Sequence, residues 1–336
     1  MALRVAINGF GRIGRLVLRS IVEHGRRDIV VVAINDLGPV ETNAHLLRYD
    51  SVHGRFPGTV SVEGDSLDVG TGPIRCTAIR NPAELPHREL NVDIAFECTG
   101  IFTSKEKAAG HLEAGAKRVI VSAPADGVDK TIVYGVNHQS LTADDLIISN
   151  ASCTTNCLAP VAQVLQALCG IERGYMTTIH SYTNDQPSLD QMHKDLYRAR
   201  AAALSMIPTS TGAAKAVGLV LPELAGKLDG SSIRVPTPNV SVVDLKFVPG
   251  RSVTRDEINA ALEEASQSPA LKGVLRVSND PLVSIDLNHD AASATVALPQ
   301  TQVVDGGLAR VLAWYDNEWG FSTRMADTAL AMGKLL

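Results

Sequence analysis

The sequence predicts an α/β fold with two domains, the first on a parallel sheet and the second on a mainly antiparallel or mixed sheet. The chain is 336 residues long, and a chain of this length usually forms about two domains. Short apolar strands alternate with helical patterns in the first half, which is typical of a parallel sheet covered by helices. After Asn150 the strands become longer and the helices fewer, which indicates an α+β second domain.

The expected strands of the first domain are short apolar runs separated by helices or turns. They are Leu3–Ile7, Ile29–Ile34, Val92–Phe96, Arg118–Ser122 and Leu146–Ser149. Between the first two strands, apolar residues recur at helical spacing from Ile13 to Ile21. Residues 51–90 are rich in glycine and proline, and they predict a hairpin-rich insertion or edge.

The second half is expected to begin with a helix from Asn156 to about Leu168. The strands expected after it are Met176–Thr183, Val240–Phe247, Leu282–Leu287, Ser293–Ala297 and Leu308–Tyr315. The last segment, Phe321 to Leu336, carries apolar residues along one helical face.

Composition excludes several classes of protein. Lys and Arg total 31 against 36 Asp and Glu, and the net charge of -5 argues against a nucleic-acid or anionic-membrane partner. The apolar runs are far too short to span a bilayer, and the start of the chain lacks the long apolar region of a signal peptide. An odd, sparse set of cysteines argues against a disulfide framework and favours a reducing, cytoplasmic compartment. The cysteines are Cys76, Cys98, Cys153, Cys157 and Cys169.

A glycine motif lies between the first strand and the first helix. Gly9, Gly11 and Gly14 form Gly-x-Gly-x-x-Gly, in which the glycines permit a tight turn, close approach of a pyrophosphate, and close packing of helix on strand. The helix N-terminus then offers free N–H groups to the phosphates. The second strand ends at Asn35-Asp36, where an acid binds the adenosine ribose and repels a 2′-phosphate. The pattern predicts a Rossmann-type domain that binds NAD, against the alternative of a tight turn without a cofactor.

A cysteine and a histidine are the candidate reactive pair. Cys153 is expected near a helix N-terminus, which together with a nearby imidazole would lower the pKa of its thiol. His180 lies near the end of the next strand, and a strand–helix–strand crossover would return it beside Cys153. A Cys/His pair suits thiolate nucleophilic catalysis. A buried unreactive cysteine, a Cys153–Cys157 disulfide and a metal site stay open, although no second close Cys/His pair supports metal.

A nucleotide cofactor and an activated thiol together suggest one reaction class. A thiolate adds to an aldehyde to form a hemithioacetal, whose hydride passes to a nicotinamide and leaves a thioester. An acceptor must then release the acyl group.

With these motifs, the chain resembles phosphorylating glyceraldehyde-3-phosphate dehydrogenase from Val5 to the C-terminal helix. The most specific segment is Ala151–Pro160, which reads ASCTTNCLAP. Three others support it: Thr209–Ala216, Arg234–Asn239 and Trp314–Gly320. The resemblance implies oxidation of D-glyceraldehyde 3-phosphate with NAD and inorganic phosphate to 1,3-bisphosphoglycerate, a step of glycolysis and gluconeogenesis. It also implies a homotetramer.

The resemblance also implies roles for single residues. Cys153 would be the nucleophile and His180 its acid–base partner. Thr183 and Arg234 would bind the phosphate of the substrate. Residues that would serve the attacking phosphate are Ser152, Thr154, Arg198, Thr211 and Gly212. Spacing alone would favour Arg198 as part of a solvated basic helix face. Residues that would bind NAD, besides the glycines of the motif, are Arg12, Ile13, Asp36, Arg80, Thr99, Gly100, Ser122 and Asn317.

The expected NAD-binding domain is 1–151, completed by a C-terminal helix at 317–336, and the expected catalytic domain is 152–316. The chain departs from the family at Phe321, where many relatives carry tyrosine. It also lacks, at Leu189–Met192, the Leu-Pro pair common to NAD-specific relatives, so the choice between NAD and NADP stays open. The alternatives are erythrose-4-phosphate dehydrogenase, a Cys/His thiol hydrolase and a non-catalytic NAD-binding sensor.

Overall fold

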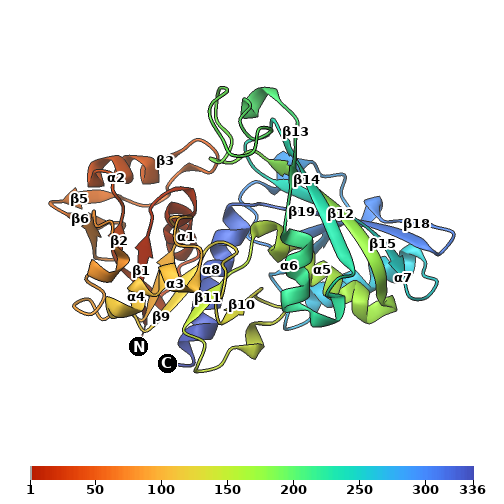
Figure 1. Cartoon of the computed structure of the whole chain (residues 1–336), viewed down its shortest axis with the longest axis horizontal. Helices are drawn as coiled ribbons and strands as arrows, with labels where there is room; N and C mark the ends of the chain where they lie inside the picture. The colour runs from red at the N-terminus through yellow and green to blue at the C-terminus, as the bar shows by residue number, and fades with distance from the viewer. Residues whose placement is uncertain (1) are drawn as a thin grey trace. The chain divides into compact units, whose positions relative to one another are not determined.

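The chain forms two compact units in a computed structural model that describes residues 2–336. The first unit comprises the chain up to Ser152 together with Ser322–Leu336, and the second comprises Cys153–Phe321. Figure 1 shows the elements of both units. Within residues 2–336, no helix has the length and apolar character needed to cross a membrane.

The first unit is built on a mostly parallel sheet (Figure 1). The strand order is β10-β11-β9-β8-β1-β2-β7-β6-β5, and only the pairs β5/β6 and β6/β7 are antiparallel. Its strands are β1 (Leu3–Asn8), β2 (Ile29–Asn35), β5 (Ser61–Glu63), β6 (Ser66–Asp68), β7 (Pro73–Thr77), β8 (Ile94–Glu97), β9 (Arg118–Val121), β10 (Lys130–Thr131) and β11 (Ile147–Ser149). All five predicted strands of this half are present, and residues 51–90 form the expected hairpin-rich edge.

Helices and short turns connect these strands. They are α1 (Arg12–Glu23), α2 (Val40–Arg48), α3 (Lys105–Ala108), α4 (Gly110–Glu113) and the 3-10 turns η1 (Pro82–Glu84) and η2 (His138–Ser140). A short hairpin of β3 (Tyr49–Asp50) and β4 (Gly54–Arg55) follows α2. The helix predicted from Ile13 to Ile21 is therefore confirmed as α1.

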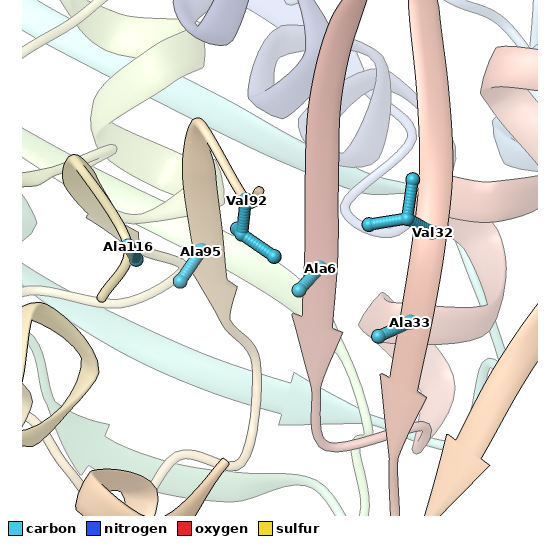
Figure 2. Packing of buried hydrophobic residues seen from close by; sticks show 6 residues of the cluster. All are labelled: Ala6, Val32, Ala33, Val92, Ala95 and Ala116. Atoms are coloured by element: carbon cyan, nitrogen blue, oxygen red, sulfur yellow. The ribbon is translucent and has the colours of Figure 1, made fainter. Parts of the chain in front are cut away.

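Small side chains pack at the centre of this sheet. Ala6 of β1 is in register with Ala33 of β2 and with Ala95 of β8 (Figure 2). The β1/β2 register shifts between Val5 and Ala6, so β2 carries one extra residue there and both Val32 and Ala33 join the same buried cluster. The cluster fixes the register of the strands whose carboxyl ends carry the glycine motif and Asp36.

The last residues of the chain complete the first unit. Thr328 donates a hydrogen bond to Asn150 (2.8 Å), and the Ser20 and Thr323 hydroxyls lie 3.0 Å apart. Arg118 donates to the backbone carbonyl of Leu335 at 2.9 Å. The predicted C-terminal helix is confirmed as α8 (Trp319–Gly333), from which Ser322 onward belongs to this unit.

The second unit is built on a mixed sheet with order β13-β14-β12-β15-β19-β17-β16, and β18 also pairs with β19. Its strands are β12 (Ile171–Ser181), β13 (Ile207–Ser210), β14 (Leu228–Val235), β15 (Ser241–Pro249), β16 (Leu275–Ser278), β17 (Ala294–Ala297), β18 (Gln302–Val304) and β19 (Leu308–Tyr315). The pairs β12/β14 and β16/β17 are parallel, while β12/β15 and β15/β19 are antiparallel. The expected mainly antiparallel or mixed sheet is confirmed.

Helices of the second unit pack against this sheet. They are α5 (Cys153–Cys169), α6 (Ala213–Val220) and α7 (Arg255–Gln267), with 3-10 turns η3 (Ala202–Leu204), η4 (Pro222–Leu224), η5 (Ser284–Leu287) and η6 (Leu298–Gln300). The helix predicted from Asn156 begins earlier, at Cys153. The strand predicted from Met176 also begins earlier, at Ile171, directly after Gly170 at φ +71°.

The predicted strand Leu282–Leu287 is wrong, because Ser284–Leu287 form the 3-10 turn η5. The Asp286 carboxylate accepts the backbone N–H of Val283 at 2.8 Å, and the N–H of Leu282 bonds to the carbonyl of Asp280. These local hydrogen bonds occupy backbone groups that a strand would offer to a neighbour.

Candidate active site

The juxtaposition of Cys153 and His180 comes from a helix and strand that run in opposite directions. The predicted strand–helix–strand crossover is wrong, because β11 before the cysteine and β12 after it belong to different sheets. Instead, α5 starts at Cys153, the chain turns at Gly170, and β12 returns along the helix. The 17-residue helix rises about 26 Å. The strand up to His180 covers a similar length, about 30 Å, so its end lies beside the start of α5.

Cys153 and His180 face each other across 3.5 Å, measured from Sγ to Nε2. Ala151, two residues before the cysteine, is buried and has φ +57°, a conformation that non-glycine residues rarely adopt. Such strain persists where the surrounding structure requires it, often at functional sites. Here it turns the chain sharply into the first turn of α5.

Arg234 and Ser181 hold the other side of the imidazole. Nδ1 of His180 lies 2.7 Å from the carbonyl of Ser181 and 2.7 Å from Nη1 of Arg234. Arg234 also donates to that carbonyl at 3.0 Å. Since β12 and β14 pair in parallel with His180 opposite Arg234, the sheet register itself sets this contact.

The pKa values of the pair move in directions that the sequence did not predict. Burial raises the pKa of the Cys153 thiol, while Arg234 and hydrogen bonds from Thr154 oppose that rise. Burial and the charge of Arg234 lower the pKa of His180 to about 3. The sequence predicts a thiol pKa lowered by the helix N-terminus and the nearby imidazole, whereas in the structure burial raises it. The imidazole is neutral near pH 7, and the cation beside it is Arg234.

Tyr315 forms a buried support for the pair. Its hydroxyl lies 2.8 Å from Oγ1 of Thr154 and 2.9 Å from Oγ1 of Thr178. Its ring meets that of His180 edge-on, with centroids 5.9 Å apart. The hydroxyl of Thr154 thus contacts the hydroxyl of Tyr315 and also hydrogen-bonds to Cys153, where it opposes the rise of the thiol pKa.

Arg198 lies in the loop between β12 and β13, so the alternative of a basic helix face is wrong. Its guanidinium donates to Asp185 at 2.6 Å and to the hydroxyl of Thr209 at 2.8 Å. Asp195 is a further ion-pair partner at 3.6 Å. The charge of Arg198 also lowers the pKa of His180, which places this guanidinium within electrostatic reach of the pair.

The remaining predicted phosphate-binding residues lie in loops of the same unit, except Ser152. Thr183 follows β12, and its backbone N–H donates to Gln186 at 3.0 Å. The hydroxyl of Thr211 accepts the N–H of Ala213 at 3.2 Å, and Gly212 directly precedes α6 at a point where an added Cβ would meet nothing within 4 Å. Ser152 is partly exposed and directly precedes α5, as the last residue of the first unit's main segment.

Asn317 is held by two serine hydroxyls. Oδ1 of Asn317 accepts hydrogen bonds from Ser181 and Ser241, both at 2.8 Å. The neighbouring Asp316 is buried, and its carboxylate accepts from the side chain of Asn239 (2.8 Å) and the N–H of Trp319 (2.7 Å). These contacts fix the turn between β19 and α8, and they link Asn317 to the residue that follows His180.

The cysteines of the structure are free, including Cys153 and the buried Cys157, so the disulfide left open by the sequence is absent. Among residues 2–336, no group of three His, Cys, Asp or Glu side chains is arranged to hold a metal ion.

The first unit contains a cavity of about 490 Å³ at the carboxyl ends of its central strands. Predicted NAD-binding residues Gly9, Gly11, Asp36, Arg80 and Thr99 line it. Open α/β sheets bind nucleotides in such a crevice at the strand carboxyl ends.

The glycines of the motif fit a bound dinucleotide. Gly9 has φ +89°, and a Cβ there would lie 2.7 Å from the backbone nitrogen of Thr99. A Cβ at Gly14 would lie 2.0 Å from the carbonyl oxygen of Gly9, so only glycine permits this packing of α1 on β1. A Cβ at Gly11 would meet nothing within 4 Å, which leaves open space beside the uncapped N-terminus of α1.

Backbone N–H groups of two loops hold the carboxylate of Asp36. One carboxylate oxygen accepts the N–H of Phe10 at 2.9 Å, and the other accepts the N–H of Gly38 at 2.9 Å. The carboxylate therefore faces both the loop and the cavity.

Other predicted NAD-binding residues do not line this cavity. They are Arg12, Ile13, Gly14, Gly100 and Ser122 in the first unit and Asn317 in the second. Arg12 is paired with Asp50 at 2.6 Å, and Gly100 has φ +73° in the turn after Thr99. The N–H of Ser122 donates to the carbonyl of Glu97 at 2.9 Å.

Comparison with known proteins identifies the family. Residues 3–105 match the NAD binding domain of glyceraldehyde 3-phosphate dehydrogenase, and residues 152–317 match its C-terminal domain. The chain belongs to the glyceraldehyde-3-phosphate dehydrogenase family. It is 73% identical over 335 residues to the glyceraldehyde-3-phosphate dehydrogenase of Xanthobacter flavus, covering 100% of both chains. It is 71% identical to that of Cereibacter sphaeroides over 336 residues (100% of both) and 57% identical to that of Geobacillus stearothermophilus over 330 residues (98% of both).

Sequence reasoning about this family member missed several residues of the site. Tyr315 lies within the Trp314–Gly320 motif, but the sequence does not show its role, because its hydroxyl partners are distant in sequence. The roles of Ser181 and Ser241 are hidden for the same reason. Asn8 and Glu97 do carry a signal, because each is a polar residue that ends a buried strand.

Proposed function

We propose that the chain oxidises D-glyceraldehyde 3-phosphate with NAD and inorganic phosphate, and releases 1,3-bisphosphoglycerate. The observation that carries the proposal is the 3.5 Å contact between Sγ of Cys153 and Nε2 of His180 beside Arg234. A nucleophile with an adjacent base, oriented by a third group, is the arrangement of covalent catalysis. The family membership and the dinucleotide cradle support the choice of substrate and cofactor.

In the first step, Sγ of Cys153 attacks the aldehyde carbon and forms a hemithioacetal. The thiol proton passes to Nε2 of His180, which can accept it because the ring is neutral near pH 7. His180 then gives that proton to the former carbonyl oxygen, which leaves a hydroxyl group. The ring is neutral again for the next step.

The second step oxidises the hemithioacetal. NAD supplies the acceptor for the hydride that leaves the substrate carbon. His180 takes the hydroxyl proton at the same time, so the carbon becomes the carbonyl of a Cys153 thioester. We propose that Asn317, held by Ser181 and Ser241, orients the nicotinamide amide with its NH₂ group.

In the third step, an oxygen of inorganic phosphate attacks the thioester carbon, and the bond to Sγ breaks. The acyl phosphate leaves, and the proton held by His180 passes to the released Sγ, which restores the Cys153 thiol and the neutral imidazole. We propose that Arg234 and Thr183 bind the phosphate of the substrate, since Arg offers planar multidentate donors. The attacking phosphate would be bound by Ser152, Thr154, Arg198, Thr211 and Gly212.

For the cofactor, we propose that residues 1–151 with 317–336 form the NAD-binding domain and residues 152–316 the catalytic domain. Residues proposed to bind NAD are Gly9, Gly11, Arg12, Ile13, Gly14, Asp36, Arg80, Thr99, Gly100, Ser122 and Asn317. Asp36 supports NAD over NADP, because its carboxylate would repel a 2′-phosphate.

We further propose a cytoplasmic homotetramer. The loop between β12 and β13 exposes large apolar side chains that water does not favour, and contact with other copies would cover them. Met192 is 97% exposed, Leu196 81% and Leu204 80%.

The test is a spectrophotometric assay of NADH formation with D-glyceraldehyde 3-phosphate, run with and without inorganic phosphate. The proposal expects turnover that requires phosphate and that falls strongly when NADP replaces NAD. Erythrose 4-phosphate is the comparison substrate. Faster, phosphate-independent oxidation of this tetrose would contradict the proposal and support erythrose-4-phosphate dehydrogenase.

A further inference from the structure

A row of polar side chains ends adjacent strands of the first sheet. Glu97, Asn8, Asn35 and Thr77 are the last residues of β8, β1, β2 and β7, which are neighbours in that order. Asn8 is in register with both Glu97 and Asn35, and Asn35 is in register with Thr77. We call these four residues the strand-end row.

Hydrogen bonds run through the strand-end row without a break. Asn8 Nδ2 donates to Oε2 of Glu97 at 2.6 Å, and Asn35 Nδ2 donates to Oδ1 of Asn8 at 2.8 Å. The hydroxyl of Thr77 donates to Oδ1 of Asn35 at 2.8 Å. Buried side chains of this kind usually pair with backbone, so a chain of side-chain contacts is unusual.

The direction of these hydrogen bonds is fixed at one end by backbone. Oδ1 of Asn35 accepts the N–H of Ile79 and Nδ2 donates to the carbonyl of Ile79, both at 2.8 Å. Because both atoms are matched to backbone groups, the Asn35 amide cannot turn over. Its Nδ2 then requires Oδ1 from Asn8, and Asn8 must present Nδ2 to Glu97.

At the other end, Glu97 must accept on both oxygens. Oε1 accepts the N–H of Thr99 at 2.8 Å and a further bond from the Thr99 hydroxyl. Oε2 accepts from Asn8. A carboxylate accepts hydrogen bonds both from Thr99 and from Asn8. The amide of a glutamine at this position would instead point its own N–H group at the N–H donor of either Thr99 or Asn8.

Two buried histidines complete the surroundings of Glu97. Nε2 of His111 lies 3.0 Å from Oε2, and Nε2 of His87 lies 3.0 Å from Nδ1 of His111. Glu97 is 1% exposed, His111 0% and His87 2%. Burial lowers the pKa of His87 to about 4, so this ring is neutral near pH 7.

Each row contact adjoins a segment that lines the 490 Å³ cavity. Asn8, Asn35 and Ile79 line the cavity themselves, beside Gly9, Asp36 and Arg80, and Glu97 binds Thr99, which also lines it. One buried carboxylate therefore ties together chain segments that converge on the proposed cofactor site.

We propose that Glu97 is a positioning residue for NAD: its carboxylate fixes the strand-end row and, through it, the segments around the cavity. The inference rests on the proposed function, since it takes NAD as the occupant. Glu97 need not touch the cofactor for this role.

The test is Glu97→Gln, compared with wild type by calorimetric titration with NAD and by steady-state kinetics. We expect the NAD dissociation constant and the KM for NAD to rise about tenfold, which corresponds to about 1.4 kcal/mol. The kcat at saturating NAD and the KM for the aldehyde should change by less than about twofold. This split distinguishes positioning of the cofactor site from general damage to the enzyme.

Asp145→Asn is the matched control. Asp145 is also a buried carboxylate of the first unit, and it accepts bonds from Lys130 (2.9 Å) and the N–H of Thr142 (2.7 Å), but it does not line the cavity. We expect the Asp145→Asn substitution to lower the melting temperature while leaving the NAD dissociation constant unchanged. An equal loss of NAD affinity in both variants would overturn the proposal, as would wild-type affinity in Glu97→Gln.

A paired variant tests the hydrogen-bond direction itself. Asn8→Asp alone sets two carboxylates against each other, so NAD binding should weaken further than in Glu97→Gln. When Asn8→Asp and Glu97→Gln are combined, the new amide can donate to the new carboxylate, which can still accept from Asn35. Recovery of NAD affinity relative to Asn8→Asp supports the inference, and additive losses contradict it. If the wild-type protein binds no NAD, that result contradicts the proposed function and therefore also the inference.

Discussion

The positive charge of Arg234 acts on the pKa values of both Cys153 and His180. It lies 2.7 Å from Nδ1 of His180, and it lowers the pKa of the Cys153 thiol while also lowering that of the imidazole. Removing this charge should therefore shift both pKa values upward. A higher thiol pKa means less thiolate at any pH below it.

We expect Arg234→Gln to slow alkylation of Cys153 by iodoacetamide about tenfold at a pH of about 8. Both proteins should react faster as pH rises, because the thiol loses its proton, and their rates should converge in strong alkali. The measurement is the alkylation rate across pH, with Arg276→Gln as an exposed-arginine control. Equal rates in Arg234→Gln and wild type would contradict the assignment.

Cys153 itself is expected to be indispensable for turnover and unnecessary for cofactor binding. Cys153→Ser should abolish NADH formation, since a hydroxyl beside a neutral imidazole is a far weaker nucleophile than a thiol. NAD titration should give the wild-type dissociation constant. Near-normal turnover in this variant would refute the covalent mechanism.

At the scale of single residues, the sequence pairs Cys153 with His180 and expects Arg234 as a phosphate ligand. It does not reveal Arg234 as a contact of the imidazole, nor Tyr315 and Thr178 as supports of the pair. Tyr315, Thr178 and Arg234 come from three strands, and the registers β12/β14, β12/β15 and β15/β19 bring them together. The direction of the thiol pKa also escaped prediction, because burial depends on packing that a linear motif does not contain.

At the scale of elements, α1 and its glycine loop respond differently to two similar substitutions. A Cβ at Gly14 would clash with the backbone of Gly9, whereas a Cβ at Gly11 would meet open space. We expect Gly14→Ala to lower the melting temperature by several degrees, because α1 must move away from β1. Gly11→Ala should leave the melting temperature near that of wild type.

Both variants should lose NAD affinity, Gly11→Ala because its methyl group occupies the space where the pyrophosphate approaches. Thermal unfolding and NAD titration measure the two effects separately. A Gly11→Ala protein that binds NAD as wild type does would place the pyrophosphate elsewhere.

Elements with strong periodicity were predictable, and short or locally bonded ones were not. The strand Leu308–Tyr315 was predicted with its observed bounds, because alternating apolar residues fit a half-buried strand. The segment 282–287 has a similar composition, but Asp286 and Asp280 bind its backbone locally. Strand β14 was missed because Gly230 and its serines hide the pattern, although it carries Arg234.

At the scale of the whole molecule, the exposed apolar side chains of the β12–β13 loop bear on assembly. We expect sedimentation to give a mass about four times the 35.7 kDa of one chain. Met192→Glu together with Leu196→Glu should shift this mass toward smaller species, because charges would be buried at the contact. Sedimentation of wild type as a single chain would contradict the proposed tetramer.

Residue patterns show the division into units as a change near Asn150, and only the family resemblance assigns the C-terminal helix to the first unit. The return of the chain to the first unit after Phe321 leaves no such trace, since apolar periodicity in α8 shows a buried face and not what covers it. Specific contacts such as Thr328 to Asn150 reveal the partner.

That return has a consequence for synthesis. The second unit, Cys153–Phe321, is continuous, so all of it is translated before Ser322–Leu336. The first unit starts earlier but needs Ser322–Leu336, which are translated after the whole of the second unit. Synthesis proceeds at about 5–20 residues per second. The first unit therefore stays incomplete while the whole second unit is synthesised. The first unit begins to be synthesised before the second, but it is the second unit whose residues are complete first.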